Sequence, residues 1–158
     1  MRVLVLAAAF AAVSCAHYTP YTAQQLIDRG THCIAGVSAA QALDGSATAL
    51  TTLGYTVTLK NAEQGVVKTA PKTIMVSATG VGNSANATDD GIAWSIQIET
   101  AGGDVVLHAV PRAFRNGSEI HDEGIWVAEV MDSKFQDLWN EIDSTLGVKP
   151  APAPAAAK

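Results

Sequence analysis

The sequence predicts an α+β domain in which an antiparallel sheet of about five strands packs one face against an N-terminal and a C-terminal helix. Strand patterns follow one another along the middle of the chain, and helical patterns stand at both ends, an order that favours α+β over an alternating parallel fold. The length of 158 residues and the 48% hydrophobic content are typical of one globular unit. Two cysteines exclude a disulfide scaffold.

The first helix is expected directly after residues 22–25 (Thr-Ala-Gln-Gln), which have the capping-box spacing of a hydroxyl followed three residues later by Gln. Leu26 and Ile27 supply an apolar side. Gly30 is placed to end the helix as its C′ residue. This predicts a short helix.

A longer helix is expected after residues 38–41 (Ser-Ala-Ala-Gln), which repeat the capping spacing, and it ends before Gly54. Its apolar residues at helical intervals are Leu43, Ala47, Leu50 and Leu53. Its small residues are Ala42, Gly45 and Ala49. These small side chains predict that the helix approaches a sheet closely.

Three strands follow. Residues 55–60 alternate apolar and polar side chains, which predicts a half-buried strand. Residues 61–65 form a turn, and residues 66–70 a second strand that ends at Pro71. Residues 73–79 are rich in β-branched side chains and predict the third strand.

Residues 80–91 offer Gly, Asn, Ser and Asp with almost no apolar content, and they predict a long loop. Residues 92–99 then show the cleanest two-residue alternation in the chain. Residues 101–104 turn this strand, and residues 105–110 return antiparallel to it before Pro111.

A polar, turn-rich stretch over residues 112–124 contains the strongest turn dipeptide, Asn116 and Gly117. An amphipathic helix is expected from Asp132 until Gly147. Its apolar stripe comprises Phe135, Leu138, Trp139, Ile142 and Leu146. We expect this helix to pack on the sheet.

Residues 1–14 have the layout of a secretory signal peptide, with a cation at Arg2 and an apolar run over residues 3–13. That run is shorter than the about 20 residues that a transmembrane helix needs. The small residues before Cys15 resemble a lipobox, which implies acylation of Cys15. Cleavage after Ala16 by ordinary signal peptidase is the alternative.

The predicted organisation has four parts. They are a signal peptide (1–14), an N-terminal segment with the short helix (15–37), a globular domain (38–148) and an Ala/Pro-rich flexible tail (149–158). Alternating Ala and Pro cannot bury a core, so the tail is expected to be semi-extended.

The Ala-rich helix that runs into Leu53, Gly54 and Tyr55, the alternating strand after it and residues 65–69 (Gly-Val-Val-Lys-Thr) resemble a pattern in small bacterial envelope lipoproteins. Their domains include those of the lipoprotein subunit of the outer-membrane β-barrel assembly machine, where strands clasp a helix. The resemblance implies a membrane-anchored protein of the cell envelope that faces the periplasm.

The folded part is acidic, with seven basic and fifteen acidic residues between residues 15 and 148. Its net charge of −8 repels phosphates, which makes nucleic acid an improbable partner. The expected partners are a membrane, reached through the N-terminal lipid, and an envelope protein.

The sequence lacks several catalytic patterns. Gly80, Val81 and Gly82 are not followed by a Gly-Lys-Ser/Thr phosphate loop, and no Gly-x-Ser-x-Gly elbow is present. We therefore expect a noncatalytic protein without a cofactor. Cys33 beside His32 is expected to be a buried thiol rather than a nucleophile, because neighbours in sequence usually point apart.

Weak metal-ligand candidates are His108, His121, Asp122 and Glu123, whose spacing matches no known ligand motif. The leading interpretation is a membrane-tethered envelope lipoprotein that acts as a protein-interaction or structural module. One alternative is a secreted small-ligand binding domain with an apolar pocket between sheet and C-terminal helix. The tryptophans of that pocket would be Trp94, Trp126 and Trp139, which could equally fill the core. A hydrolase that uses His108 or His121 is a third interpretation.

Overall fold

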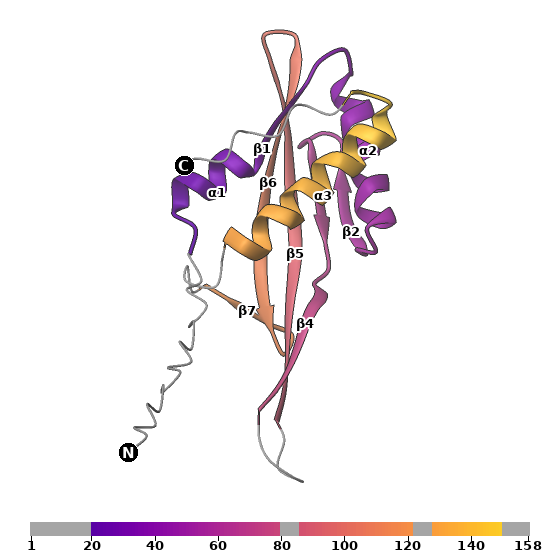
Figure 1. The fold of residues 1–158 in the computed structure, drawn as a ribbon. Helices are drawn as coiled ribbons and strands as arrows, with labels where there is room; N and C mark the ends of the chain where they lie inside the picture. The colour runs from indigo at the N-terminus through magenta and orange to yellow at the C-terminus, as the bar shows by residue number, and fades with distance from the viewer. Residues whose placement is uncertain (1–19, 80–85, 122–127, 150–158) are drawn as a thin grey trace, which may run out of the picture.

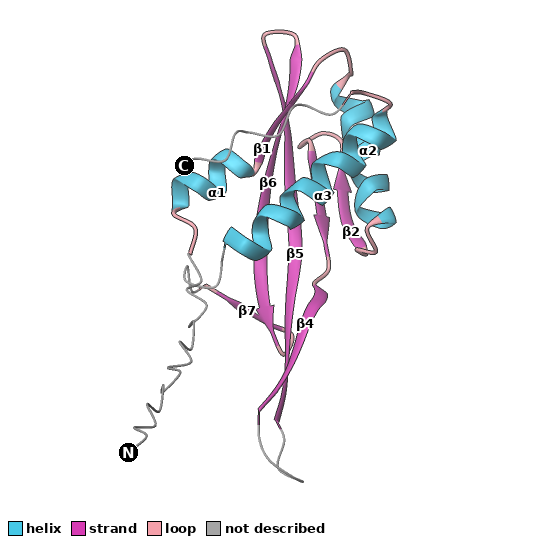
Figure 2. Ribbon diagram, in the orientation of Figure 1, coloured by secondary structure: helices cyan, strands magenta, loops and turns pink. Residues whose placement is uncertain are grey.

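A computed structural model describes residues 20–79, 86–121 and 128–149, and these form a seven-stranded antiparallel sheet with three helices (Figures 1 and 2). The predicted α+β class is confirmed. The elements in chain order are α1 (Ala23–Arg29), β1 (Thr31–Ile34), α2 (Ala39–Thr52), β2 (Val57–Asn61), β3 (Val66–Thr69), β4 (Lys72–Thr79), β5 (Asn86–Ala101), β6 (Asp104–Arg115), β7 (Ser118–Ile120) and α3 (Ala128–Leu146).

The long hairpin of β5 and β6 forms the centre of the sheet. Its register runs from Asp90 opposite Arg115 to Ala101 opposite Asp104. The strand order is β1-β6-β5-β3-β2. Because β5 and β6 are long, β4 pairs with β5 beyond β3, and β7 pairs with β6 beyond β1.

The core lies between the sheet and the helical layer of α2 and α3, which cover one face (Figure 1). The inward side chains of β5 are Ile92, Trp94, Ile96 and Ile98, and those of α3 are Met131, Phe135, Leu138 and Ile142. The rings of Trp94 and Phe135 meet edge to face with centroids 5.3 Å apart. Each fully buried side chain of this size contributes about 2 kcal/mol of hydrophobic stabilisation.

Both predicted capping boxes are present, at Thr22 with Gln25 and at Ser38 with Gln41. The predicted end of the first helix at Gly30 is confirmed, since α1 ends at Arg29 and Gly30 is its C-cap, with a right-handed φ of −78°. Gly30 also needs to be small, because a Cβ there would lie 2.4 Å from the carbonyl oxygen of Ala109.

Gly45 also has a different neighbour from the one expected. A Cβ at Gly45 would lie 2.6 Å from Cδ2 of Leu146, which belongs to α3. Gly45 therefore lets α2 approach α3, while α2 also packs on β2, β3 and β5 as its small residues predicted. On α1, Leu26 contacts the core, whereas Ile27 is 59% exposed, so only one of the two predicted apolar residues is used.

The predicted loop over residues 80–91 is wrong over its second half. Residues 86–91 belong to β5 and pair with β4, and residues 80–85 lie outside the described part. Cross-strand backbone hydrogen bonds to β4 and β6 override the low strand propensity of Asn, Asp and Gly here.

The predicted end of the following strand at Pro111 is also wrong, since β6 continues to Arg115. The amide of Ala109 donates to the carbonyl of Gly30, on the side of β6 away from β5. Pro111 is two residues further along β6, so its nitrogen points to the same side of the strand. On that side it lies in the gap between β1 and β7, where no described strand pairs with β6. Proline is tolerated there because no ladder hydrogen bond is lost.

Asn116 and Gly117 have φ values of 50° and 79° and form the tight β6–β7 turn as predicted. The C-terminal helix begins at Ala128, before the expected Asp132. Leu59 of β2 is 38% exposed, so this strand is less buried than its alternation predicted, because β2 is at the end of the strand order.

Candidate functional site

Several predicted site residues lie outside the described ranges. They are Cys15, Asp122, Glu123 and Trp126, together with the signal peptide and residues 150–158 of the tail. Among the helices that the structure describes, none combines the length and apolar character needed to cross a membrane. The acylation of Cys15 therefore stays a prediction.

The two described tryptophans make separate contacts. Trp94 is 1% exposed and packs against Phe135 of α3, so its ring occupies the space between sheet and helix where the ligand pocket was expected. Trp139 is stacked on His32 with ring centroids 4.9 Å apart, and its Nε1 donates to the carbonyl of Arg29 over 2.9 Å. Trp139 therefore connects α3 to the N-terminal segment.

His108 and His121, the metal-ligand candidates that the structure describes, do not belong to a cluster of potential ligands. His108 lies on β6 with its Nδ1 3.2 Å from Oγ1 of Thr31 and its Nε2 3.9 Å from a carboxylate oxygen of Glu99. His121 follows the end of β7. In residues 20–79, 86–121 and 128–149, no three His, Cys, Asp or Glu side chains are placed to share a metal ion.

A buried pair that the sequence did not reveal joins β1 to α3. Nε2 of His32 lies 2.7 Å from Oδ1 of Asp143, and the two side chains are only 10% and 3% exposed. Because 111 positions separate the partners, no local pattern could have predicted the pair. Cys33 pairs with Val106 and is exposed, and since side chains alternate along a strand, its thiol points away from His32. The expected burial of Cys33 is wrong.

The pair lies beside a cavity of about 310 Å³ at the junction of β1 and the end of α3. Its lining residues are His32, Cys33, Ile34, Ala35, Asp143, Val148 and Lys149. The volume is at the lower end of the range for small-molecule pockets. Because Oδ1 of Asp143 is already paired with His32, the first role of the pair is to fasten β1 to α3.

A second set of contacts fastens α1 to the start of α3. The hydroxyl of Tyr21 donates to Oδ1 of Asp132, and Nε of Arg29 lies 3.1 Å from the same oxygen. Burial, and then the hydrogen bond to Asp132, raise the pKa of Tyr21 far above its usual value. The N-terminal segment is thus fixed to α3 at both ends of that helix.

The face of the sheet opposite α2 and α3 carries no described helix, and we call it the open face. Its residues on β5 and β6 are Ala93, which is buried, and Ser95, Gln97, Glu99, Val106, His108, Val110, Arg112 and Phe114. Val110 is 57% exposed. The guanidinium of Arg112 lies 5.4 Å from the ring centroid of Phe114 and is paired with Glu119, and that hydrogen bond lowers the pKa of Glu119. The open face therefore combines apolar and charged groups.

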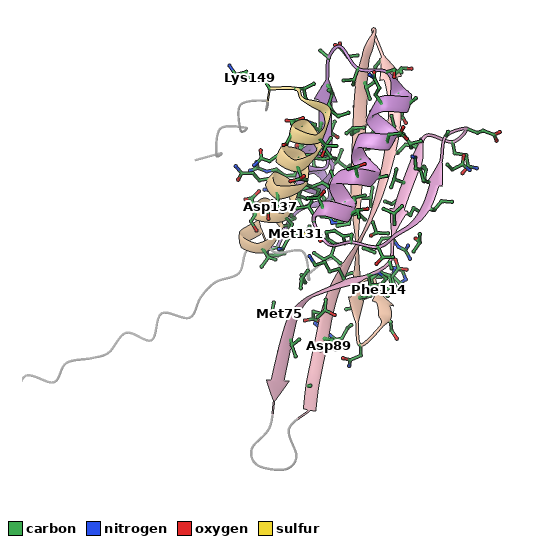
Figure 3. The ribbon with its side chains drawn as sticks, turned by 90° about the vertical axis from the view of Figure 1, so that its right-hand side faces the viewer. Met75, Asp89, Phe114, Met131, Asp137 and Lys149 are labelled. Carbon is green, nitrogen blue, oxygen red and sulfur yellow. The ribbon has the colours of Figure 1, made fainter. Side chains whose placement is uncertain are left out.

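β4 is an edge strand of the sheet, and it pairs with the part of β5 that extends beyond β3. It pairs with β5 on one side, and no described strand pairs with its other side, which we call the β4 edge. Figure 3, where Met75 and Asp89 are labelled, shows β4 and β5 projecting beyond the helical layer. Met75 and Val76 are 49% and 64% exposed.

Comparisons with known proteins give a distant structural similarity and no family. No family model matches the chain, and no curated protein matches it. One solved structure to which it is similar is a DUF4468 family protein from Bacteroides ovatus, with a TM-score of 0.44 and 11% sequence identity. The similarity covers 77% of this chain and 86% of that one.

Proposed function

We propose that the protein is a noncatalytic lipoprotein of the bacterial cell envelope, which is anchored through an acylated Cys15 and binds another envelope protein with its open face. The observation that carries this proposal is the exposure of Val110, beside the half-buried Arg112–Phe114 pair, on a sheet face that no described helix covers. Mixed apolar and charged surfaces of this kind are typical of transient protein interfaces.

The attachment of the N-terminal segment supports the proposed anchor. Tyr21 is fixed to Asp132, and Cys15 precedes Tyr21 by six residues. An extended chain spans about 3.5 Å per residue. An acyl group on Cys15 would therefore hold the folded domain within about 20 Å of the membrane surface.

The charge of the domain supports a protein partner rather than direct lipid contact. Residues 15–148 carry a net charge of −8, which repels anionic headgroups. A partner with basic groups would be attracted by the same field, and the rate of association would fall as salt is added.

Photo-crosslinking in cells tests the role of the open face. A photoreactive amino acid at Val110 is expected to give one defined crosslinked protein, and the same group at Ile27 is the control. Ile27 and Val110 are matched in exposure, at 59% and 57%, but Ile27 lies on α1. Equal crosslinking at both positions, or none at Val110, would contradict the proposal.

A further inference from the structure

We infer that two copies of this chain associate through their β4 edges, which pair antiparallel and join the two sheets into one. The inference goes beyond the proposed function, because it requires neither the acyl anchor nor the open face. It rests on three observations: β4 is protected in its first half only, its exposed side chains lie on both faces of the sheet, and residues 73–79 carry no charge.

Edge strands in proteins are normally protected from pairing by charges, prolines or bulges. All three occur at the beginning of β4, since Pro71 directly precedes the strand, Lys72 is its first residue and the register shifts between Thr73 and Met75. Lys72 is also held in place, as its Nζ lies 5.1 Å from the centroid of the Tyr55 ring. Residues 75–79 (Met-Val-Ser-Ala-Thr) contain no charge, no proline and no register shift. The outer half of the edge is therefore unprotected.

The exposed side chains favour an added strand over a protein docked on one face. Met75 and Val76 are neighbours in a strand, so they point to opposite faces of the sheet. Both are exposed, at 49% and 64%. A strand added in the plane of the sheet contacts side chains on both faces, whereas a protein that lies on one face would cover only one of the two.

A second copy is the occupant that the charges fit. A two-fold axis perpendicular to the sheet near Val76 places each Val76 opposite its counterpart and Met75 opposite Ser77 of the other copy. Residues 73–79 carry no charge, so no like charges face each other, although residues 15–148 of each copy have a net charge of −8. The same contact covers both β4 edges at once and closes the assembly as a dimer.

Sedimentation velocity of the purified protein over a wide concentration range tests the inference. The native chain is expected to show a reversible monomer–dimer equilibrium, and Val76→Lys is expected to raise the dissociation constant at least about tenfold, equivalent to about 1.4 kcal/mol. Val110→Lys is the matched control, because it makes the same change at a similarly exposed valine of an interior strand. A native chain that stays monomeric, or a Val76→Lys chain that dimerises as the native one does, would overturn the inference.

A short thiol-specific crosslinker locates the contact. In a Cys33→Ser background, Val76→Cys is expected to give a dimer with twice the mass of one chain, and Val110→Cys is expected to give none. If Val110→Cys gives the dimer and Val76→Cys does not, the contact is the open face and the β4 inference is wrong. Cys15 is replaced by Ser in both variants as well, so that no second thiol is present and the result is independent of acylation.

Discussion

At the residue scale, the buried pair of His32 and Asp143 holds β1 against α3. The imidazole is stacked on Trp139 and bonded to a carboxylate that is almost fully enclosed. Removing one member of such a pair leaves an uncompensated polar or charged group in the interior, which costs more than the pair itself contributes.

His32→Phe is therefore expected to lower the free energy of unfolding by about 3 kcal/mol at neutral pH, although the ring can still stack on Trp139. Urea unfolding measures the change. His108→Phe, the same substitution on the open face, is the control and should change stability by no more than about 0.5 kcal/mol. The double variant His32→Phe with Asp143→Leu should recover most of the loss, and equal losses in the single and double variants would contradict this account.

Tyr21 is expected to make the stability of the folded protein fall at high pH. Its pKa is raised in the folded state, so the folded protein keeps the phenol protonated at pH values where the unfolded chain loses the proton. The stability that Tyr21 contributes is therefore complete below its unfolded pKa of about 10 and is lost as pH rises above it.

Tyr21→Phe is expected to lower stability by about 1–2 kcal/mol at pH 8 through loss of the hydrogen bond to Asp132. The difference from the native chain should shrink as pH rises above about 10. Urea unfolding of both chains across this range tests the prediction. Tyr55 is present in both chains and cancels, so a difference that stays constant with pH would show that the phenol does not titrate as described.

At the scale of elements, sequence patterns predicted those elements whose signal is local. Both capping boxes, the turn at Asn116 and the apolar stripe of α3 lie within short stretches of chain, and the structure has them all. β1 and β7 were missed, because strands of four and three residues are too short to show a period. The contacts of the N-terminal segment with α3 were missed for a different reason. Their partners lie about 110 positions apart in the sequence, so no local pattern reveals them.

Gly30 and Gly45 are both in crowded positions, but the crowding atoms are backbone atoms at Gly30 and side-chain atoms at Gly45. A Cβ at Gly30 would meet the carbonyl oxygens of Ala109 and Leu26 at 2.4 and 2.8 Å, and backbone atoms cannot move away cheaply. A Cβ at Gly45 would meet the end of the Leu146 side chain, which is only partly buried and can rotate.

Gly30→Ala is therefore expected to cost about 3 kcal/mol. Gly45→Ala is expected to cost about 1 kcal/mol or less, because the higher helix propensity of Ala offsets part of the crowding. Thermal or urea unfolding of the two variants gives the order. The opposite order would show that the β1–β6 junction is looser than its contacts indicate.

At the scale of the whole molecule, the N-terminal segment connects the predicted anchor to the folded body. Its contacts with Asp132 and Asp143 at the two ends of α3 attach it to the folded body from Tyr21 onward, six residues after Cys15. An anchor at Cys15 would therefore keep the folded body close to the membrane, which a long flexible linker would not do.

The intact mass of the native mature protein tests the central claim, that the chain is an acylated envelope lipoprotein, most directly. We expect a chain that begins at Cys15 and is heavier than the unmodified polypeptide by a diacylglyceryl group and an amide-linked acyl chain. An unmodified chain that begins at His17, as cleavage after Ala16 would give, or one that still begins at Met1, would contradict the claim.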